Sequence, residues 1–226
     1  YFLLKRKTYI ATCVLGKSTD TLDSAGQITS QVPVETISDG RLRQALDGFV
    51  GEIDQIPPIY SAKSVDGVRA YRLSSKGVDV ELRPCHVEVY SLELLSRESN
   101  EIFRFKVECS GGTYIRSLCR DLGAALGYPA YMAALERTQN GMMRLEDAVT
   151  LERIQSDVTD GFVTLETFGT SLQRADFSDK LRMKIENGVK QSVSLENGLA
   201  SVYVGDEFYG IGEVKEGVLR VVARDL

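Results

Sequence analysis

The chain has 226 residues, with a hydrophobic fraction of 43% and a charged fraction of 26%, which are ordinary values for a globular protein. A chain of this length forms one large domain or one domain with a small appendix, and it buries roughly 70% of its unfolded surface without metal or disulfide support. The net charge of −5 argues mildly against a nucleic-acid ligand, so any basic binding surface must be local.

The four cysteines and the single histidine do not support a metal site. No two cysteines form a CxxC pair, and one histidine cannot complete a usual zinc ligand set, so we expect free thiols and no metal. The sequence has no signal peptide and no apolar run of about 18 residues. We therefore expect a cytoplasmic protein that does not contact a membrane.

The first half of the chain predicts strands and one amphipathic helix. Residues 8–15 are rich in β-branched and aromatic types, which predicts a buried strand. Apolar residues at helical spacing predict a helix over 41–50. Residues 86–95 predict a strand with a bulge near Tyr90, and the clean alternation over 102–109 predicts a half-buried strand in an antiparallel sheet.

The second half begins with a helix and ends in short strands. A helix is predicted from Tyr114, with Thr113 as its cap and Gly127 as its end. Further helices are predicted over 129–137, 146–155 and 178–187, followed by β runs at 199–204, 208–214 and 217–223. The expected fold class is α+β, a mixed and mainly antiparallel sheet flanked by helices, with domains 1–160 and 161–226, the second small and β-rich.

The sharpest local feature is the segment Cys109–Leu118, which reads CSGGTYIRSL. A strand runs into a glycine pair and then into a helix, so backbone can come close to a ligand and free N–H groups can face an anion. Arg116 lies in the first helical turn, where a cation opposes the helix dipole. These observations alone leave open an ordinary strand–turn–helix with a surface arginine.

The string GTYIRSLxxDLGxxLG at Gly112–Gly127 resembles the TruB family of pseudouridine synthases. Further segments follow in the family's order. They are Lys7-Thr8-Tyr9 (KxY), Leu15–Gly26 (LGxxTDTxDxxG), Ile56–Ala62 with Gly67 and Tyr71 (PPxYSAxKxxGxxxY), and Leu135–Thr138 with Gly141 (LRRTxxGxF).

The resemblance implies the pseudouridine synthase fold with a PUA-like C-terminal domain. It also implies isomerisation of a uridine in the T-loop of tRNA, with no cofactor or metal. The partner would be the T-arm of tRNA, bound by a monomer. Such chemistry takes the base out of its stack and holds it between an aromatic platform and apolar walls.

The same resemblance supplies candidate site residues. Tyr9, Tyr114 and Arg116 are implied as catalytic residues, with Tyr9 packed on the flipped base and Arg116 paired with a catalytic aspartate. The candidate RNA-binding residues are Leu135, Lys7, Lys63, Tyr60 and Arg69.

The chain departs from the family pattern in two places. No GxLDxxAxGxL segment, which carries the family's catalytic aspartate, occurs in the sequence, so we expect that aspartate from residues upstream of Tyr1. Asp20 and Asp23 are interpreted as turn and loop formers rather than substitutes. Ser64 stands where the family has lysine, and Ser75 where it has arginine.

Two hypotheses remain: a tRNA pseudouridine synthase, or a non-catalytic module that binds tRNA and aids its folding.

Overall fold

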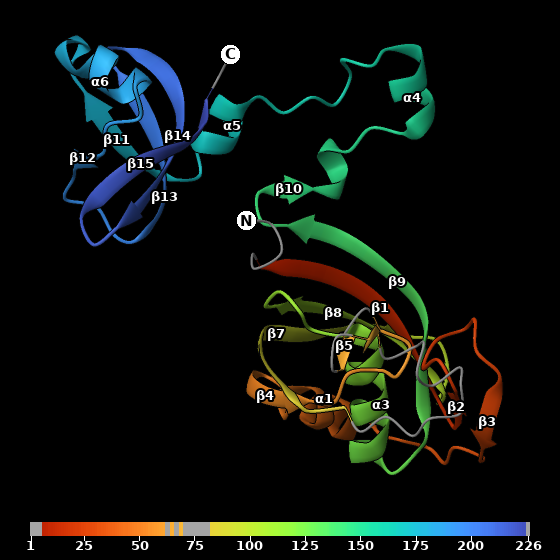
Figure 1. Ribbon diagram of the computed structural model, residues 1–226. Helices are drawn as coiled ribbons and strands as arrows, with labels where there is room; N and C mark the ends of the chain where they lie inside the picture. Colours follow the sequence, from red (N-terminus) through yellow and green to blue (C-terminus); the bar gives the residue numbers. More distant parts are fainter. Residues whose placement is uncertain (1–5, 62–63, 66–67, 70–81, 225–226) are drawn as a thin grey trace. The chain divides into compact units, whose positions relative to one another are not determined.

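The computed structural model describes residues 6–61, 64–65, 68–69 and 82–224. The chain divides into two compact units, Tyr1–Glu146 and Asp147–Leu226 (Figure 1). Each unit has its own sheet and its own cluster of buried apolar side chains. The fold is α+β, as the sequence predicts.

A six-stranded sheet in the order β10-β9-β1-β8-β7-β4 forms the first unit, and all its neighbouring strands are antiparallel. Its strands are β1 (Lys7–Leu15), β4 (Gly51–Gln55), β7 (Cys85–Arg97), β8 (Ile102–Cys109), β9 (Ala130–Asn140) and β10 (Met143–Arg144). Two short hairpins accompany it, β2 (Lys17–Thr19) with β3 (Ile28–Gln31), and β5 (Ser64–Val65) with β6 (Val68–Arg69).

The central strands follow the predicted alternation. On β8, Phe103, Phe105 and Val107 are buried, while the residues between them are exposed, because successive side chains of a strand point to opposite faces. On β7, the register with β8 shifts between Val89 and Ser91, which confirms the predicted bulge.

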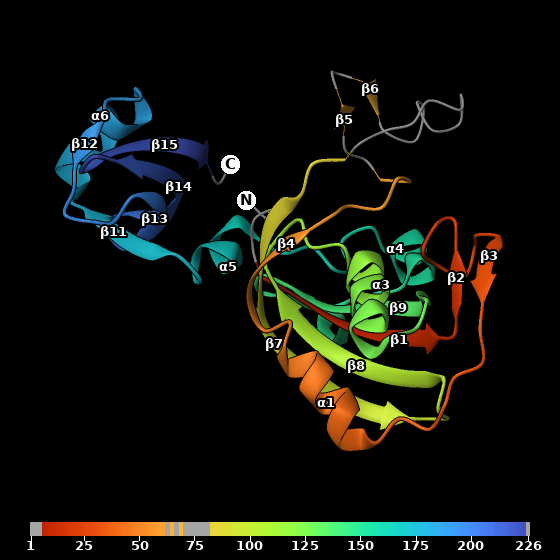
Figure 2. The same ribbon diagram turned by 90° about the horizontal axis from the view of Figure 1, so that it is seen from below.

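Two helices cover one face of this sheet, α1 (Asp39–Asp47) and α3 (Ile115–Leu126) (Figure 2). The apolar stripe of α3 includes Leu118, Cys119 and Leu122, all fully buried in the core that the sheet and both helices share. The Sγ atom of Cys13 on β1 donates to the carbonyl of Cys119 at 3.9 Å. This contact identifies the face of β1 that points toward α3.

Two predictions in this unit are wrong. Residues 129–137 belong to the strand β9, because pairing with all of β1 outweighs the helix propensity of its alanines, methionine and leucine. Thr113 does not cap α3. The cap is Tyr114, which makes no side-chain cap hydrogen bond, and the Thr113 hydroxyl instead donates to the carbonyl of Ser110 at 2.9 Å. Gly127 does end α3, with a φ of 88° that suits glycine.

A five-stranded sheet in the order β11-β13-β14-β15-β12 forms the second unit, which is the predicted small β-rich part. Its strands are β11 (Gln173–Phe177), β12 (Gln191–Ser192), β13 (Gly198–Val204), β14 (Glu207–Lys215) and β15 (Val218–Arg224). Its short helices are α4 (Leu151–Ser156), α5 (Leu165–Gly169), η2 (Asp179–Leu181) and α6 (Arg182–Glu186), and the short helix η1 (Leu145–Asp147) spans the boundary between the units. The unit begins at Asp147, before the predicted boundary at residue 160.

No helix in the described ranges is long and apolar enough to cross a membrane.

Candidate active site on the helix-covered face of the sheet

Tyr9 and Leu135 lie on the face of the sheet that α3 covers. Tyr9 is four residues before Cys13 on β1, so its side chain points to the same face as the Cys13 thiol that contacts α3. Leu135 is the β9 partner of Ala11, and directly opposite residues of paired strands share a face. Leu135 is 44% exposed although Ala11 is fully buried. An exposed leucine here leaves apolar surface for a ligand.

Tyr9 is half-buried and packs against the core of the first unit. Burial raises the pKa of its hydroxyl, and the interaction with the neighbouring Cys109 thiol raises it too, whereas the guanidinium of Arg137 lowers it. The hydroxyl therefore stays protonated at neutral pH. Lys7, two residues earlier on β1, shares this face, and burial lowers the pKa of its ammonium group.

Arg116, in the first turn of α3, is held by three oxygen acceptors. Its Nη1 atom donates to the Thr21 carbonyl and to Oδ2 of Asp23, both at 3.0 Å. Its Nη2 atom donates to the carbonyl of Tyr60 at 2.8 Å. The Arg116 and Asp23 side chains are each 22% exposed. The pairing offsets the unfavourable position of a cation at a helix N-terminus and fixes the guanidinium plane.

Asp23 is both a loop former and the ion-pair partner of Arg116. Its Oδ1 atom accepts from the Thr21 hydroxyl at 2.6 Å and from the backbone N–H of Ala25 at 3.1 Å, as a loop-forming aspartate does. Its Oδ2 atom contacts Arg116, which the interpretation of Asp23 as only a loop former missed. The preceding Leu22 has a φ of 61°, a conformation that strains a leucine. Asp20 fits the loop interpretation, because its Oδ1 atom accepts from the Gln27 N–H at 2.8 Å.

Hydrogen bonds connect the start of α3 to Gln55 and to the proline-containing segment that begins at Ile56. The backbone N–H of Tyr114 donates to Oε1 of the buried Gln55 at 2.7 Å. The hydroxyl of Ser117 and the Nη2 atom of Arg120 both donate to the carbonyl of Ile56, at 2.8 and 3.1 Å. The first half of α3 therefore fixes the extended segment that follows β4.

The remaining candidates divide between described and undescribed positions. Tyr60 is 38% exposed and contributes its carbonyl to Arg116. Arg69 is a residue of β6, paired with Ser64. Lys63 lies outside the described residues. The structure thus forms two groups from the described candidates. Arg116 contacts Asp23 and the backbone of Tyr60. Tyr9, Lys7 and Leu135 lie on one face of the adjacent strands β1 and β9.

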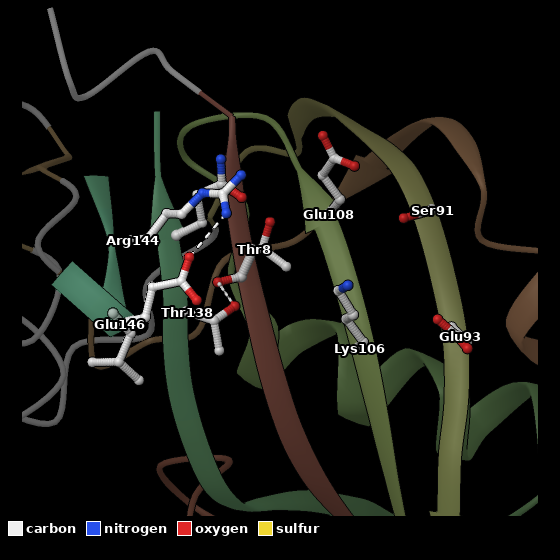
Figure 3. Close-up of a pocket in the computed structure, with 10 residues that line it drawn as sticks. Thr8, Ser91, Glu93, Lys106, Glu108, Thr138, Arg144 and Glu146 are labelled. Atoms are coloured by element: carbon white, nitrogen blue, oxygen red, sulfur yellow. Dashed lines mark hydrogen bonds and ion pairs between the residues drawn. The ribbon is translucent and has the colours of Figure 1, made fainter. Parts of the chain in front are cut away.

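The opposite face of the sheet carries a separate hollow of about 680 Å³ (Figure 3). Thr8, Lys106 and Glu108 line it with residues of β7, β9 and β10, and its charges are mixed in sign. None of the candidate residues named above lines this hollow. Among the described residues, no group of three or more His, Cys, Asp or Glu side chains could hold a metal ion.

Comparisons with known families match this arrangement of motifs. The family model described as TruB family pseudouridylate synthase (N terminal domain) matches residues 1–115, and the one described as tRNA pseudouridylate synthase B C-terminal domain matches residues 116–177. The chain belongs to the TruB family. The two family models meet at Arg116, inside the first structural unit, so their division differs from the division by packing.

Curated relatives of this TruB-family chain are named tRNA pseudouridine synthase B. The one from Listeria innocua is 38% identical over 84% of this chain, and the one from Clostridium tetani is 34% identical over 96% of it. The chain spans 65% of the length of the Listeria protein and 78% of that of the Clostridium protein.

Solved structures show the same fold for this TruB-family chain. A chain of the crystal structure of a Cbf5-Nop10-Gar1 complex matches 98% of it with a TM-score of 0.68 and 21% identity, and this chain covers 67% of that one. A chain of an H/ACA RNP bound to a substrate RNA containing 2′-deoxyuridine matches 99% of it with a TM-score of 0.66, and 66% of that chain is covered.

Proposed function

We propose that this protein is an isomerase that converts uridine to pseudouridine in the T-loop of tRNA. In this reaction the N-glycosidic bond of uridine breaks and a bond from C5 of uracil to C1′ forms, while the C5 proton leaves and N1 gains one, so substrate and product are isomers. The observation that carries the proposal is the similarity to relatives named tRNA pseudouridine synthase B over most of the chain.

The helix-covered face of the sheet suits a flipped base. Tyr9 offers a ring whose neutral hydroxyl can donate a hydrogen bond, and Leu135 offers exposed apolar surface on the adjacent strand. A base taken from its stack needs such an aromatic and apolar enclosure. In this proposal Tyr114, at the start of α3, packs beside the base, and Tyr60, Lys63 and Arg69 contact the RNA strand.

Arg116 is proposed to orient the nucleophile. Thr21, Asp23 and Tyr60 take three of its hydrogen bonds, and its remaining donors can pair with a second carboxylate. The aspartate of the family's GxLDxxAxGxL segment would be that carboxylate. Asp23 is a poor nucleophile, because both its oxygens already accept hydrogen bonds.

The test compares turnover with binding on an unmodified tRNA transcript, using the full polypeptide. We expect pseudouridine at one T-loop position, and we expect Arg116→Met to lower kcat by about a hundredfold or more, because a preorganised charge is lost. The Kd for the transcript should change by less than about threefold, since Arg116 faces the reacting groups rather than the RNA backbone. Unmodified but tightly bound RNA with the wild type would instead support the non-catalytic tRNA-binding module.

A further inference from the structure

A bulge in β9 determines which side chain lies beside Tyr9. Thr8 of β1 pairs with Gln139, but Tyr9 pairs with Arg137, so Thr138 is the extra residue of β9. The Thr138 hydroxyl donates to the Thr8 carbonyl at 3.3 Å, and both residues line the hollow on the opposite face (Figure 3). Without the extra residue, Thr138 would be the partner of Tyr9. Bulges next to binding sites often re-aim a side chain in this way.

The bulge places Arg137 on the same face as the proposed base platform. Arg137 is directly opposite Tyr9 and two residues from Leu135, so all three side chains leave the sheet on the side of α3. Burial raises the pKa of Tyr9, and the charge of Arg137 and a hydrogen bond from it act in the opposite direction. Burial lowers the pKa of Lys7, and the charge of Arg137 lowers it further. These effects require the guanidinium to lie close to both groups.

Arg137 is an exposed residue, and none of the ion pairs among the described residues includes its guanidinium. The neighbouring Glu136 points to the other face, because it pairs with Ile10. An arginine has five N–H donors, so a hydrogen bond to the Tyr9 hydroxyl leaves several for a ligand. A second cation, Lys7, lies on the same face. In a protein with a net charge of −5, this is a local basic surface.

We propose that Arg137 is a substrate-binding residue whose guanidinium hydrogen-bonds the Tyr9 hydroxyl and binds a backbone phosphate of the RNA strand beside the flipped uridine. The inference rests on the proposed function and adds a specific contact to it. A planar guanidinium can make both contacts at once, and a phosphate fits its paired donors.

The salt dependence of binding tests this contact. Each phosphate contact contributes about 0.7–0.9 to the slope of log affinity against log salt concentration. We expect Arg137→Gln to make the slope for an unmodified T-arm stem–loop RNA less steep by about this amount. Binding at low salt should weaken by about tenfold. Arg104→Gln is the matched control, because Arg104 is exposed on β8 and pairs with Thr12 on the opposite face. This variant removes the same charge, and its slope should equal the wild-type slope within experimental error.

Arg137→Lys separates phosphate binding from a packing role. Lysine retains the charge without the planar fork, so the salt slope should equal the wild-type value. The kcat of Arg137→Lys should fall below that of the wild type, because an ammonium group cannot hold the Tyr9 hydroxyl and a phosphate in the same fixed geometry. Thermal unfolding midpoints of all variants check that they fold. If Arg137→Gln does not fold, the kcat of Arg137→Lys carries the test, and a wild-type kcat in that variant contradicts the inference. The inference is wrong if the slope of Arg137→Gln equals that of Arg104→Gln. If the wild-type protein still modifies tRNA in that case, the proposed function stands and only the Arg137 contact is refuted. If the wild-type protein neither binds nor modifies tRNA, the proposed function itself is refuted.

Discussion

The pairing of Arg116 with Asp23 joins two residues that the chain separates widely. A loop of Thr21, Asp23 and Ala25 holds the carboxylate, so its Oδ2 atom meets the guanidinium without freedom to turn away. In the proposed function, a charge held this way costs no reorganisation when the reaction begins. The pair is therefore more informative about mechanism than either residue alone.

Asp23→Asn should lower kcat by about tenfold to a hundredfold while leaving the Kd for tRNA within about twofold, because asparagine keeps one oxygen acceptor but removes the charge that fixes Arg116. Single-turnover pseudouridine formation measures the first quantity and filter binding the second. Asp20→Asn is the control: Asp20 lies in the same loop, accepts from Gln27, and makes no contact with Arg116 in the structure. Equal losses in both variants would mean that loop integrity, rather than the Arg116 pair, sets the rate.

At the scale of elements, the backbone conformation of the glycine that ends α3 contributes to stability. Gly127 has a φ of 88°, in the left-handed region, and nothing lies within 4 Å of the position where a Cβ would stand. Gly48, at the end of α1, has a φ of −66°. Gly127→Ala should therefore lower the free energy of unfolding by about 1 kcal/mol through backbone strain alone, whereas Gly48→Ala should leave it unchanged or raise it slightly.

Urea unfolding of the two variants measures this difference. If Gly48→Ala destabilised the protein as much as Gly127→Ala, the strain argument would fail.

Elements whose patterning agrees with their packing could be predicted from sequence. The strand over 102–109, the bulge in β7 and the helix that ends at Gly127 all have strong local patterns. The segment 129–137 could not be predicted in this way, because its local composition favours a helix and only the long pairing with β1 makes it a strand.

The same limit applies to the candidate site. The motif at Gly112–Gly127 indicates Arg116, but the partner Asp23 lies 93 residues away, so no local spacing reveals the contact. The position of Arg137 beside Tyr9 depends on a bulge that sequence periodicity does not show.

On the scale of the whole molecule, two separate cores predict two unfolding events. Leu122 is fully buried in the core of the first unit, and Val202 is fully buried in that of the second. Leu122→Ala should lower the stability of the first unit by about 2–5 kcal/mol and leave the second unchanged, since a cavity acts on the core that contains it. Val202→Ala should do the reverse, with a smaller effect because fewer atoms are removed.

Scanning calorimetry resolves the two transitions and shows which one each variant shifts. A single transition that moves with both variants would show that the units unfold cooperatively.

The three hydrogen-bond acceptors of Arg116 couple the local unfolding of two segments of the chain. One guanidinium holds the Thr21–Asp23 loop and the Tyr60 segment against α3, so neither can leave alone without breaking bonds to the same side chain. Two backbone amides report on these segments: Met132 donates to the Leu22 carbonyl and Tyr114 to the Gln55 side chain. Loss of Arg116 should speed hydrogen–deuterium exchange at both amides together, while the amide of Leu118 inside the helix keeps its protection.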